Sequence, residues 1–316
     1  MPEWTRKHLI DVEELDLWEI NALLDMAAKF KREASLLAKE GFTLPPLKGM
    51  TIALLFYESS TRTSNSFATA ARNIGAAVLN FSKGTSSANK GETLIDTALN
   101  IEAMNVQGFV IRHSSPGAAL MLARAVKGCV ANGGDGRHAH PTQALLDMMT
   151  IIEVKKQIEG LNVGIVGDIA HSRVARSLMH GLTKLGANVM VAGPATMMPE
   201  HLPGGVMKVN GVEEVMKHAE VLYFLRIQLE RMTGGPLIPS LREYNEVYGL
   251  TPERMDRLKK EQVVMHPGPV NRGVELSAAS ADCPASFILP QVTNGVYVRM
   301  AVLYQLLSVV KGVKVC

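Results

Sequence analysis

The chain has 316 residues, a length that can bury a sizeable core and that we expect to divide into two domains. It is 47% hydrophobic and 20% charged with a net charge of +3, and no block of Lys and Arg supports nucleic acid as a partner. We expect no signal peptide, because the start carries Glu3 and lacks an apolar core, and no membrane span, because no apolar run approaches ~18–20 residues. Cys129, Cys283 and Cys316 are isolated, which argues against a disulfide framework or zinc site and favours a cytoplasmic location.

Apolar runs and helical periodicities alternate along the first half of the chain. The predicted elements are helix 12–40, strand 51–57, helix 61–74, strand 77–81, helix 92–104, strand 107–112, helix 117–126, strand 127–131 and helix 140–153. Strands that alternate with helices in this way predict a parallel sheet flanked by helices.

A second α/β unit is predicted after the turn signal at 159–161. Its first elements are strand 162–167, helix 172–185 and strand 188–192. The spacing imitates a nucleotide-binding unit, but Gly164 and Gly167 do not complete the glycine fingerprint, so an ordinary strand-to-helix turn is favoured. A last helix at 294–311 has an apolar face that we expect to pack on the first domain.

The fold class predicted from these elements is α/β, with two domains that are each a parallel sheet flanked by helices. We place the first domain at 1–150, with the C-terminal helix 292–316 packing back on it, and the second at 151–291. Ligands of such proteins usually bind at the carboxyl ends of the strands, so we expect the active site in the cleft between the domains.

A group of hydroxyl side chains and one arginine stands between strand 51–57 and helix 61–74. Ser60, Thr61 and Thr63 lie where the helix begins, among backbone N–H groups that have no partner within the helix. Together with the helix dipole and the Arg62 guanidinium, these groups suit a phosphate dianion. A simple N-cap beside a solvated arginine is the alternative that the local sequence leaves open.

Further candidates follow other predicted elements of the first domain. Lys90 stands in a polar loop, either solvated or as a mobile arm that reaches a phosphate. Arg112 ends a strand, where it faces a ligand or forms a surface ion pair. His140 precedes a helix that carries Gln143 one turn on, which suits hydrogen bonds to a carbonyl and an amide. A metal held by His138 and His140 is disfavoured, because no further His or Cys lies at ligand spacing.

In the second domain the candidates are cations and neutral donors. Arg173 and Arg226 follow apolar, strand-like runs and could each bind a carboxylate with two hydrogen bonds, or form an exposed salt bridge. The rigid turn 266–269 offers backbone carbonyls. Because neither paired catalytic acids nor a nucleophile elbow is found, the pattern favours anionic substrates and catalysis by positioning.

Taken in order, these segments resemble the aspartate/ornithine carbamoyltransferase family from about Thr51 to the C-terminal helix. The motifs are Ser-Thr-Arg-Thr at 60–63, Lys-Gly-Glu-Thr at 90–93, Arg-His at 112–113, His-Pro-Thr-Gln at 140–143, Arg-x-Gln-x-Glu-Arg at 226–231 and His-Pro-Gly-Pro at 266–269. The resemblance implies transfer of a carbamoyl group from carbamoyl phosphate to the amine of L-aspartate, in pyrimidine synthesis, without a cofactor or metal. The first domain would bind carbamoyl phosphate and the second aspartate.

The resemblance also implies a role for each matching residue. The residues implied for carbamoyl phosphate are Ser60, Thr61, Arg62, Thr63, Ser86, Arg112, His140, Gln143, Pro267 and Gly268. Those implied for L-aspartate are Lys90, Arg173, Arg226 and Gln228. The catalytic residues would be Arg62, Thr63, Lys90, Arg112 and His140. Thr63, Arg112 and His140 would polarise the carbamoyl oxygen, while Gln143 and the Pro267 and Gly268 carbonyls would accept from the carbamoyl NH2.

Assembly is implied as well. Ser86 and Lys90 would enter the active site of a neighbouring subunit, so that a homotrimer with shared sites would be the smallest active form. Glu58 would link the two domains through Arg173 and Arg231. A regulatory chain or another pyrimidine enzyme is a possible further partner, whereas a membrane or nucleic acid is not expected.

The sequence departs from the family at Ser64 and Ala68, where arginine and glutamate are usual, and at Leu229, where lysine is usual. These changes bear on the turnover rate more than on the identity of the ligands. A catalytically silent homologue that serves as an assembly partner is therefore one alternative. The ornithine-using branch is another, although it typically carries His-Cys-Leu-Pro where this chain has His-Pro-Gly-Pro at 266–269. A dinucleotide-dependent oxidoreductase lacks the glycine fingerprint.

Overall fold

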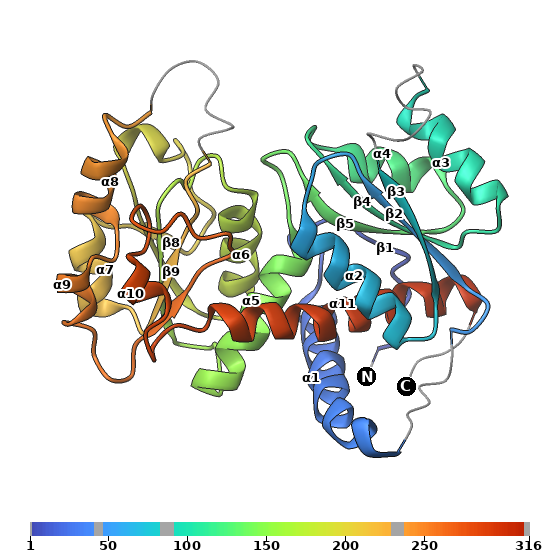
Figure 1. The fold of residues 1–316 in the computed structure, drawn as a ribbon, viewed down its shortest axis with the longest axis horizontal. Coiled ribbons are helices and arrows are strands. Elements are labelled where there is room, and N and C mark those ends of the chain that lie inside the picture. The colour runs from blue at the N-terminus through green and yellow to red at the C-terminus, as the bar shows by residue number, and fades with distance from the viewer. Residues whose placement is uncertain (1, 41–46, 83–91, 229–236, 313–316) are drawn as a thin grey trace. The chain divides into compact units, whose positions relative to one another are not determined.

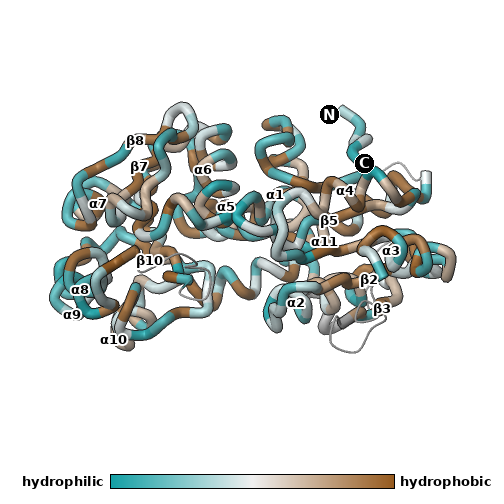
Figure 2. The backbone as a smooth tube through the Cα atoms, turned by 90° about the horizontal axis from the view of Figure 1, so that it is seen from above, coloured by the Kyte–Doolittle hydropathy of each residue, from teal (hydrophilic) through white to brown (hydrophobic). Residues whose placement is uncertain are grey.

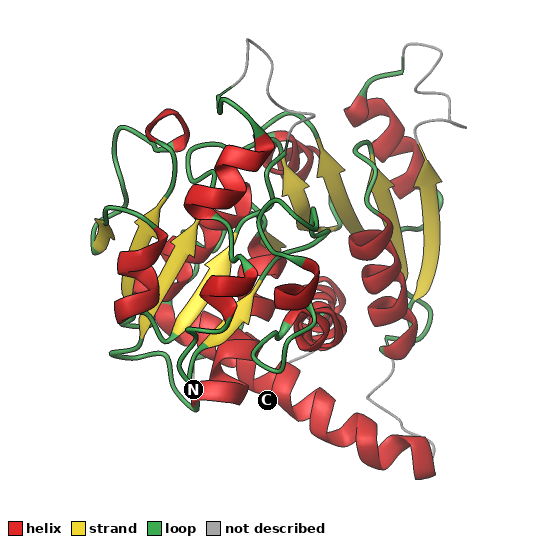
Figure 3. Ribbon diagram, turned by 60° about the vertical axis from the view of Figure 1, so that its left-hand side comes forward, coloured by secondary structure: helices red, strands yellow, loops and turns green. Residues whose placement is uncertain are grey.

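The computed structural model describes residues 2–40, 47–82, 92–228 and 237–312. The chain divides into two compact units, unit 1 (Met1–Met149 with Thr293–Cys316) and unit 2 (Thr150–Val292) (Figure 1). Each unit contains one sheet of parallel strands with helices packed beside it (Figure 3), which confirms the predicted fold class. Within the described ranges no helix is both long and apolar enough to cross a membrane.

The sheet of unit 1 has five parallel strands in the order β1-β5-β4-β2-β3. They are β1 (His8–Leu9), β2 (Thr51–Phe56), β3 (Ala77–Ser82), β4 (Gly108–His113) and β5 (Cys129–Asp135). Strands β2, β3 and β4 confirm their predictions to within one residue at each end. Strand β1 was not predicted, and β5 runs beyond the predicted end at residue 131, because the rest of it carries no apolar side chain.

Among the described residues, six helices belong to unit 1 in whole or in part. They are α1 (Leu17–Glu40), α2 (Thr61–Asn73), α3 (Leu94–Ala103), α4 (Ala118–Ala125), α5 (Pro141–Lys155) and α11 (Ile288–Lys311). The prediction that the first helix begins at residue 12 was wrong. It begins at Leu17 because Glu19 in its first turn accepts a hydrogen bond from the Asp16 N–H at 2.8 Å, which fixes the helix start.

Helix α11 packs within unit 1 (Figure 1). Its Tyr304 ring lies edge-on to Phe30 of α1 with centroids 5.8 Å apart, and Asn294 accepts from Lys31 at 2.7 Å. The buried Arg299 lies over the Phe67 ring of α2 at 5.1 Å and donates to Ser66 at 3.0 Å. Burial lowers the pKa of this arginine to about 10. Helix α11 therefore supports the helix on which the phosphate site was predicted.

The sheet of unit 2 also has five parallel strands, in the order β10-β9-β6-β7-β8. They are β6 (Asn162–Val166), β7 (Asn188–Ala192), β8 (Val206–Lys208), β9 (Val221–Phe224) and β10 (Val263–Met265). The helices are α6 (Arg173–Lys184), α7 (Val212–His218), α8 (Leu241–Tyr248), α9 (Pro252–Met255) and α10 (Ala278–Ala281), with a 3-10 turn at Ala195–Met197. Strands β6 and β7 and helix α6 confirm their predictions to within a residue. Strands β8 and β10 were not predicted, because three residues carry too little periodicity.

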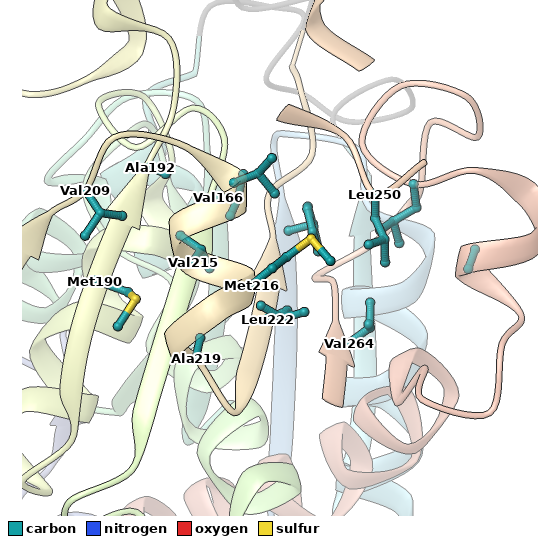
Figure 4. Close-up of a cluster of buried hydrophobic side chains, with 14 residues drawn as sticks. Val166, Met190, Ala192, Val209, Val215, Met216, Ala219, Leu222, Leu250 and Val264 are labelled. Carbon is teal, nitrogen blue, oxygen red and sulfur yellow. The ribbon is translucent and has the colours of Figure 1, made fainter. Parts of the chain in front are cut away.

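One core cluster of unit 2 lies between helix α7 and the sheet. Val215 of α7 packs with Val166, Leu222 and Val264 from three adjacent strands (Figure 4). Hydrophobic residues concentrate on the strands, whereas the outer helices such as α9 are largely hydrophilic (Figure 2). The strands therefore read as apolar runs, as expected of parallel strands that are covered on both faces.

Gly164 lies in the middle of β6, at a point where helix α7 approaches the sheet closely. A Cβ atom at this position would clash with Cγ1 of Val215 and lie 3.2 Å from Cβ of Ala219. We expect Gly164→Ala to lower the free energy of unfolding by about 1–3 kcal/mol, because the packed core cannot absorb the extra methyl group. Chemical denaturation measures this. Gly204→Ala is the control, since nothing lies within 4 Å of its added Cβ; equal stability of the two variants would contradict the packing.

Candidate active site

The loops that follow β2, β4 and β5 lie at one edge of the unit 1 sheet, because these strands are parallel and adjacent. The backbone N–H groups of Tyr57 and Glu58 donate to the Arg112 carbonyl at 2.9 and 3.3 Å, which ties the loop after β2 to the end of β4. The Arg112 guanidinium donates to Glu58 Oε1 at 2.9 Å and to the Gly133 carbonyl at 3.2 Å, and its contact with Thr63 Oγ1 is longer, 3.5 Å. Three predicted site residues are thus brought together.

The start of α2 forms the next part of this edge. Ser60 is the N-cap, and its hydroxyl accepts from the Thr63 N–H at 3.4 Å. Thr61 and Arg62 are exposed, whereas Thr63 is buried. Because the first turn carries no acidic residue, the positive end of the helix dipole is not neutralised by the helix itself. This end of α2 suits a phosphate group.

Asp135 fixes the turn that leads to His140. Its carboxylate is buried and accepts from the backbone N–H of Ala139 at 3.1 Å and of Gly117, before α4, at 2.8 Å. Gly136 has a φ of +50° and packs directly on Pro116, so a side chain would not fit there. Sequence reasoning missed Asp135, although its place in a Gly-Asp-Gly turn was a usable signal.

His140 and Gln143 stand on the first turn of α5. His140 is buried and accepts the Gln143 N–H through its carbonyl at 3.0 Å, next to Pro141 at the first helical position, as predicted. The Gln143 side-chain nitrogen donates to the buried Asp147 at 3.0 Å, which leaves the amide oxygen as the atom suited to accept from a ligand. This pair can therefore offer the imidazole ring of His140 and the amide oxygen of Gln143 to a ligand, the latter as an acceptor.

His138 lies between two carboxylates instead of completing a metal site. Its Nδ1 is 3.2 Å from Asp135 Oδ2, and its Nε2 is 3.5 Å from Asp11 Oδ2. In the part of the chain that the structure describes, no group of three or more His, Cys, Asp or Glu side chains is arranged to hold a metal ion.

In unit 2 the loops after β6, β9 and β10 share the carboxyl edge of the sheet. After β6, Ser172 caps α6 by accepting from the Ala175 N–H at 3.1 Å, and Arg173 follows with only 3% of its surface exposed. His171 Nδ1 lies 2.8 Å from Asp168 Oδ1 in the same loop. A buried guanidinium at a helix start suits an anionic ligand.

The two other loops of this edge carry the remaining predicted residues. Arg226 and Gln228 are partly exposed and flank the buried Ile227 after β9. After β10, the Gly268 N–H donates to His266 Nδ1 at 2.8 Å. Both loops contact the buried Glu275, which sequence reasoning missed; it accepts from Asn271 in its own loop and from Ile227, 48 positions earlier.

Some predicted residues are not placed with the others. Glu58 forms an ion pair with Arg112 inside unit 1, whereas the resemblance implies Arg173 and Arg231 as its partners, and that link stays a prediction. Ser86, Lys90, Leu229 and Arg231 lie outside the described residues. Of the departures from the family, Ser64 is partly exposed and Ala68 is buried, one turn apart on α2.

The fold and these two sheet edges define a two-domain α/β enzyme that acts on anionic small molecules. Residues 7–153 match the family model of the aspartate/ornithine carbamoyltransferase carbamoyl-P binding domain, and residues 159–306 match that of the Asp/Orn binding domain. The chain belongs to the aspartate/ornithine carbamoyltransferase family, as the resemblance predicted.

Individual relatives agree with this assignment. The chain is 51% identical to an aspartate carbamoyltransferase catalytic subunit of Syntrophus aciditrophicus, over 96% of this chain and 98% of the relative. It is 50% identical to that of Halothermothrix orenii, over 95% of each. Among solved structures, the aspartate transcarbamoylase of Trypanosoma cruzi in complex with carbamoyl phosphate has a TM-score of 0.85 and 30% identity, over 96% of this chain and 98% of that one.

The start of α2 yields a direct prediction. We expect Arg62→Gln to weaken the binding of inorganic phosphate about tenfold, because a charge-assisted hydrogen bond contributes about 1.5–3 kcal/mol. The melting temperature should stay unchanged, since the side chain is exposed. Isothermal titration calorimetry measures the affinity. Arg72→Gln, exposed in the last turn of the same helix, is the matched control, and equal affinity of the Arg62 variant and the wild type would contradict the site.

Proposed function

We propose that the chain transfers the carbamoyl group of carbamoyl phosphate to the amine of L-aspartate, which gives N-carbamoyl-L-aspartate and phosphate in pyrimidine biosynthesis. The observation that carries the proposal is the Arg112 guanidinium at the end of β4. It is held by Glu58 at 2.9 Å and lies at 3.5 Å from Thr63, in the uncompensated first turn of α2. A cation beside the first turn of a helix, at one sheet edge, matches a ligand that joins a phosphate to a polarised carbonyl.

The chemistry needs orientation and charge stabilisation. The aspartate amine attacks the carbonyl carbon, a C–N bond forms, and the C–O bond to phosphate breaks as a phosphate oxygen accepts the amine proton. Phosphate is a good leaving group, so no covalent enzyme intermediate is required. Thr63, Arg112 and His140 donate to the carbamoyl oxygen as negative charge develops on it.

Other acceptors and donors fix the two substrates. The Gln143 amide oxygen, with its nitrogen bonded to Asp147, accepts from the carbamoyl NH2 together with the backbone carbonyls of Pro267 and Gly268. The first turn of α2, from Ser60 through Thr63, holds the phosphate. These assignments agree with the capping geometry of α2 and with the Gln143–Asp147 bond.

Aspartate is favoured over ornithine by the charges of the unit 2 edge. Arg173, Arg226 and Gln228 present two guanidinium groups and an amide, which suit two carboxylates and repel the cationic end of ornithine. The turn after β10 reads His266-Pro267-Gly268-Pro269, without the Cys-Leu pair typical of the ornithine-using branch.

A steady-state assay with carbamoyl phosphate and either amino acid tests the proposal. We expect turnover with L-aspartate alone, and a 10²–10³-fold loss of kcat in Arg112→Ala, about the effect of removing one oxyanion donor. Arg72→Ala, which removes an exposed arginine in the last turn of α2, is the control. Turnover with ornithine would contradict the substrate, and silence with both amino acids would favour a catalytically silent assembly partner.

We further propose a cytoplasmic homotrimer with shared active sites. Exposed apolar side chains support a subunit contact on the neighbouring helices α3 and α4; these are Leu99, Met104, Leu120 and Met121. The family resemblance supports Ser86 and Lys90 as the residues that a neighbouring copy contributes. A regulatory chain or another pyrimidine enzyme is a further partner that this proposal permits.

Subunit mixing tests the shared site. If Lys90 acts in the site that holds the neighbour's His140, Lys90→Ala and His140→Ala chains are each inactive alone. Random mixing in equal amounts should restore about a quarter of wild-type activity, because that share of sites pairs two intact residues across a ring interface. Each variant mixed with itself is the control. No recovery in mixed trimers, verified by mass, would contradict shared sites.

A further inference from the structure

The carboxylate of Glu275 joins two loops at the carboxyl edge of unit 2. Oε1 accepts from the Ile227 N–H at 2.8 Å and from Asn271 Nδ2 at 3.0 Å, and Oε2 accepts from the Asn271 N–H at 3.0 Å. Asn271 Nδ2 also donates to the Ile227 carbonyl at 3.0 Å. The backbone of the loop after β9 is thus bonded through one carboxylate and one amide to the loop after β10.

Glu275 also faces the histidine of the turn after β10. His266 Nε2 lies 3.9 Å from Glu275 Oε1, and both side chains are 0% exposed. Because His266 Nδ1 accepts the Gly268 N–H at 2.8 Å, the neutral ring carries its proton on Nε2, the nitrogen that faces the carboxylate. The negative charge of Glu275 therefore favours the tautomer that holds Gly268.

The segment that carries Glu275 is itself anchored in the core. The Glu275 carbonyl accepts from the Leu250 N–H at 2.9 Å. The next residue, Leu276, is fully buried in the core cluster that also contains Val215 of α7. A buried carboxylate needs hydrogen-bond partners, and here every partner is a donor. The backbone that carries the Glu275 carboxylate is therefore held by its own hydrogen bond and by the burial of the next residue.

The position of this charge is unexpected for an edge that would bind a dicarboxylate. A carboxylate near such a ligand repels it, so Glu275 does not improve the edge through its charge alone. Its hydrogen bond to the loop after β9 instead ends on Ile227, which lies between Arg226 and Gln228. Its charge faces His266, whose Nδ1 accepts the N–H of Gly268, the residue that follows Pro267. These neighbours are the groups assigned above to the aspartate carboxylates and the carbamoyl NH2.

We propose that Glu275 is a positioning residue that holds the segments 226–228 and 267–268 in one shared geometry, so that aspartate and the carbamoyl group are aligned together. It does not touch either substrate. This inference rests on the proposed function and deepens it, because it names the group that couples the two ligand-binding loops of unit 2.

Glu275→Gln is the first test, since it keeps the shape and replaces one acceptor oxygen by a donor nitrogen that faces N–H groups. We expect the KM for L-aspartate to rise at least tenfold and kcat to fall, as about 1.4 kcal/mol corresponds to each factor of ten. The affinity for inorganic phosphate, assigned to unit 1, should stay unchanged. Glu246→Gln, an exposed carboxylate on α8 paired with Arg242, is the matched control and should leave all three values unchanged.

A double-mutant cycle separates positioning from general damage. Because Glu275 is proposed to act on aspartate by positioning the segment that carries Arg226, Glu275→Gln should raise the aspartate KM less than threefold when Arg226 is already glutamine. Fully additive effects would overturn the proposal. Asn271→Ala, which removes the amide link to the Ile227 carbonyl and to Glu275, should act in the same direction more weakly, and it serves if Glu275→Gln does not fold.

The outcomes distinguish the two claims. An inactive wild type overturns the proposed function and this inference with it. An active wild type whose Glu275→Gln and Asn271→Ala variants both keep its aspartate KM overturns the positioning role alone.

Discussion

Each described strand pairs in parallel with its neighbours, so the loops that follow the strands collect at one edge of each sheet. In unit 1 this brings the start of α2, the end of β4 and the start of α5 to the same edge. In unit 2 it does the same for the loops after β6, β9 and β10. Segments separated widely in the sequence can form one site because the strand order makes β2, β4 and β5 neighbours, and likewise β6, β9 and β10.

Within these edges, carboxylates act behind the cationic and N–H groups that would meet the substrates. Glu58 holds Arg112, Asp135 holds the turn before His140, and Glu275 accepts hydrogen bonds from Ile227 and Asn271. Such bonds restrict the rotamers and backbone of the binding groups before any ligand arrives, which reduces the reorganisation that catalysis requires. A protein that uses anionic substrates thus contains anions of its own, each one paired with donors.

The local sequence predicted those parts of the site that lie at the start of a helix. The apolar run of β2 and the hydroxyl cluster after it identified the start of α2, and Pro141 identified the start of α5. The second half of β5 was missed because its backbone is held by β4 and by polar side chains, and not by apolar burial. Periodicity cannot detect a strand of that kind.

Long-range polar bonds limited the prediction in the same way. Glu275 stands in an apolar sequence context, and its donor Ile227 is 48 positions away, so nothing nearby marks it as buried. Asp135 likewise accepts from Gly117, 18 positions earlier. The family motifs named the residues that would touch the substrates, whereas the hydrogen bonds of Asp135 and Glu275 became visible only in three dimensions.

The proposed function requires that the edge of unit 1 predicted to bind phosphate and the edge of unit 2 predicted to bind carboxylates serve one reacting pair of substrates. N-(phosphonacetyl)-L-aspartate carries a phosphonate and an aspartate in one molecule, so its affinity measures this directly. Isothermal titration calorimetry should show that it binds at least 10²-fold more tightly than inorganic phosphate, because the second interaction becomes intramolecular. Binding no tighter than that of phosphate would contradict the account.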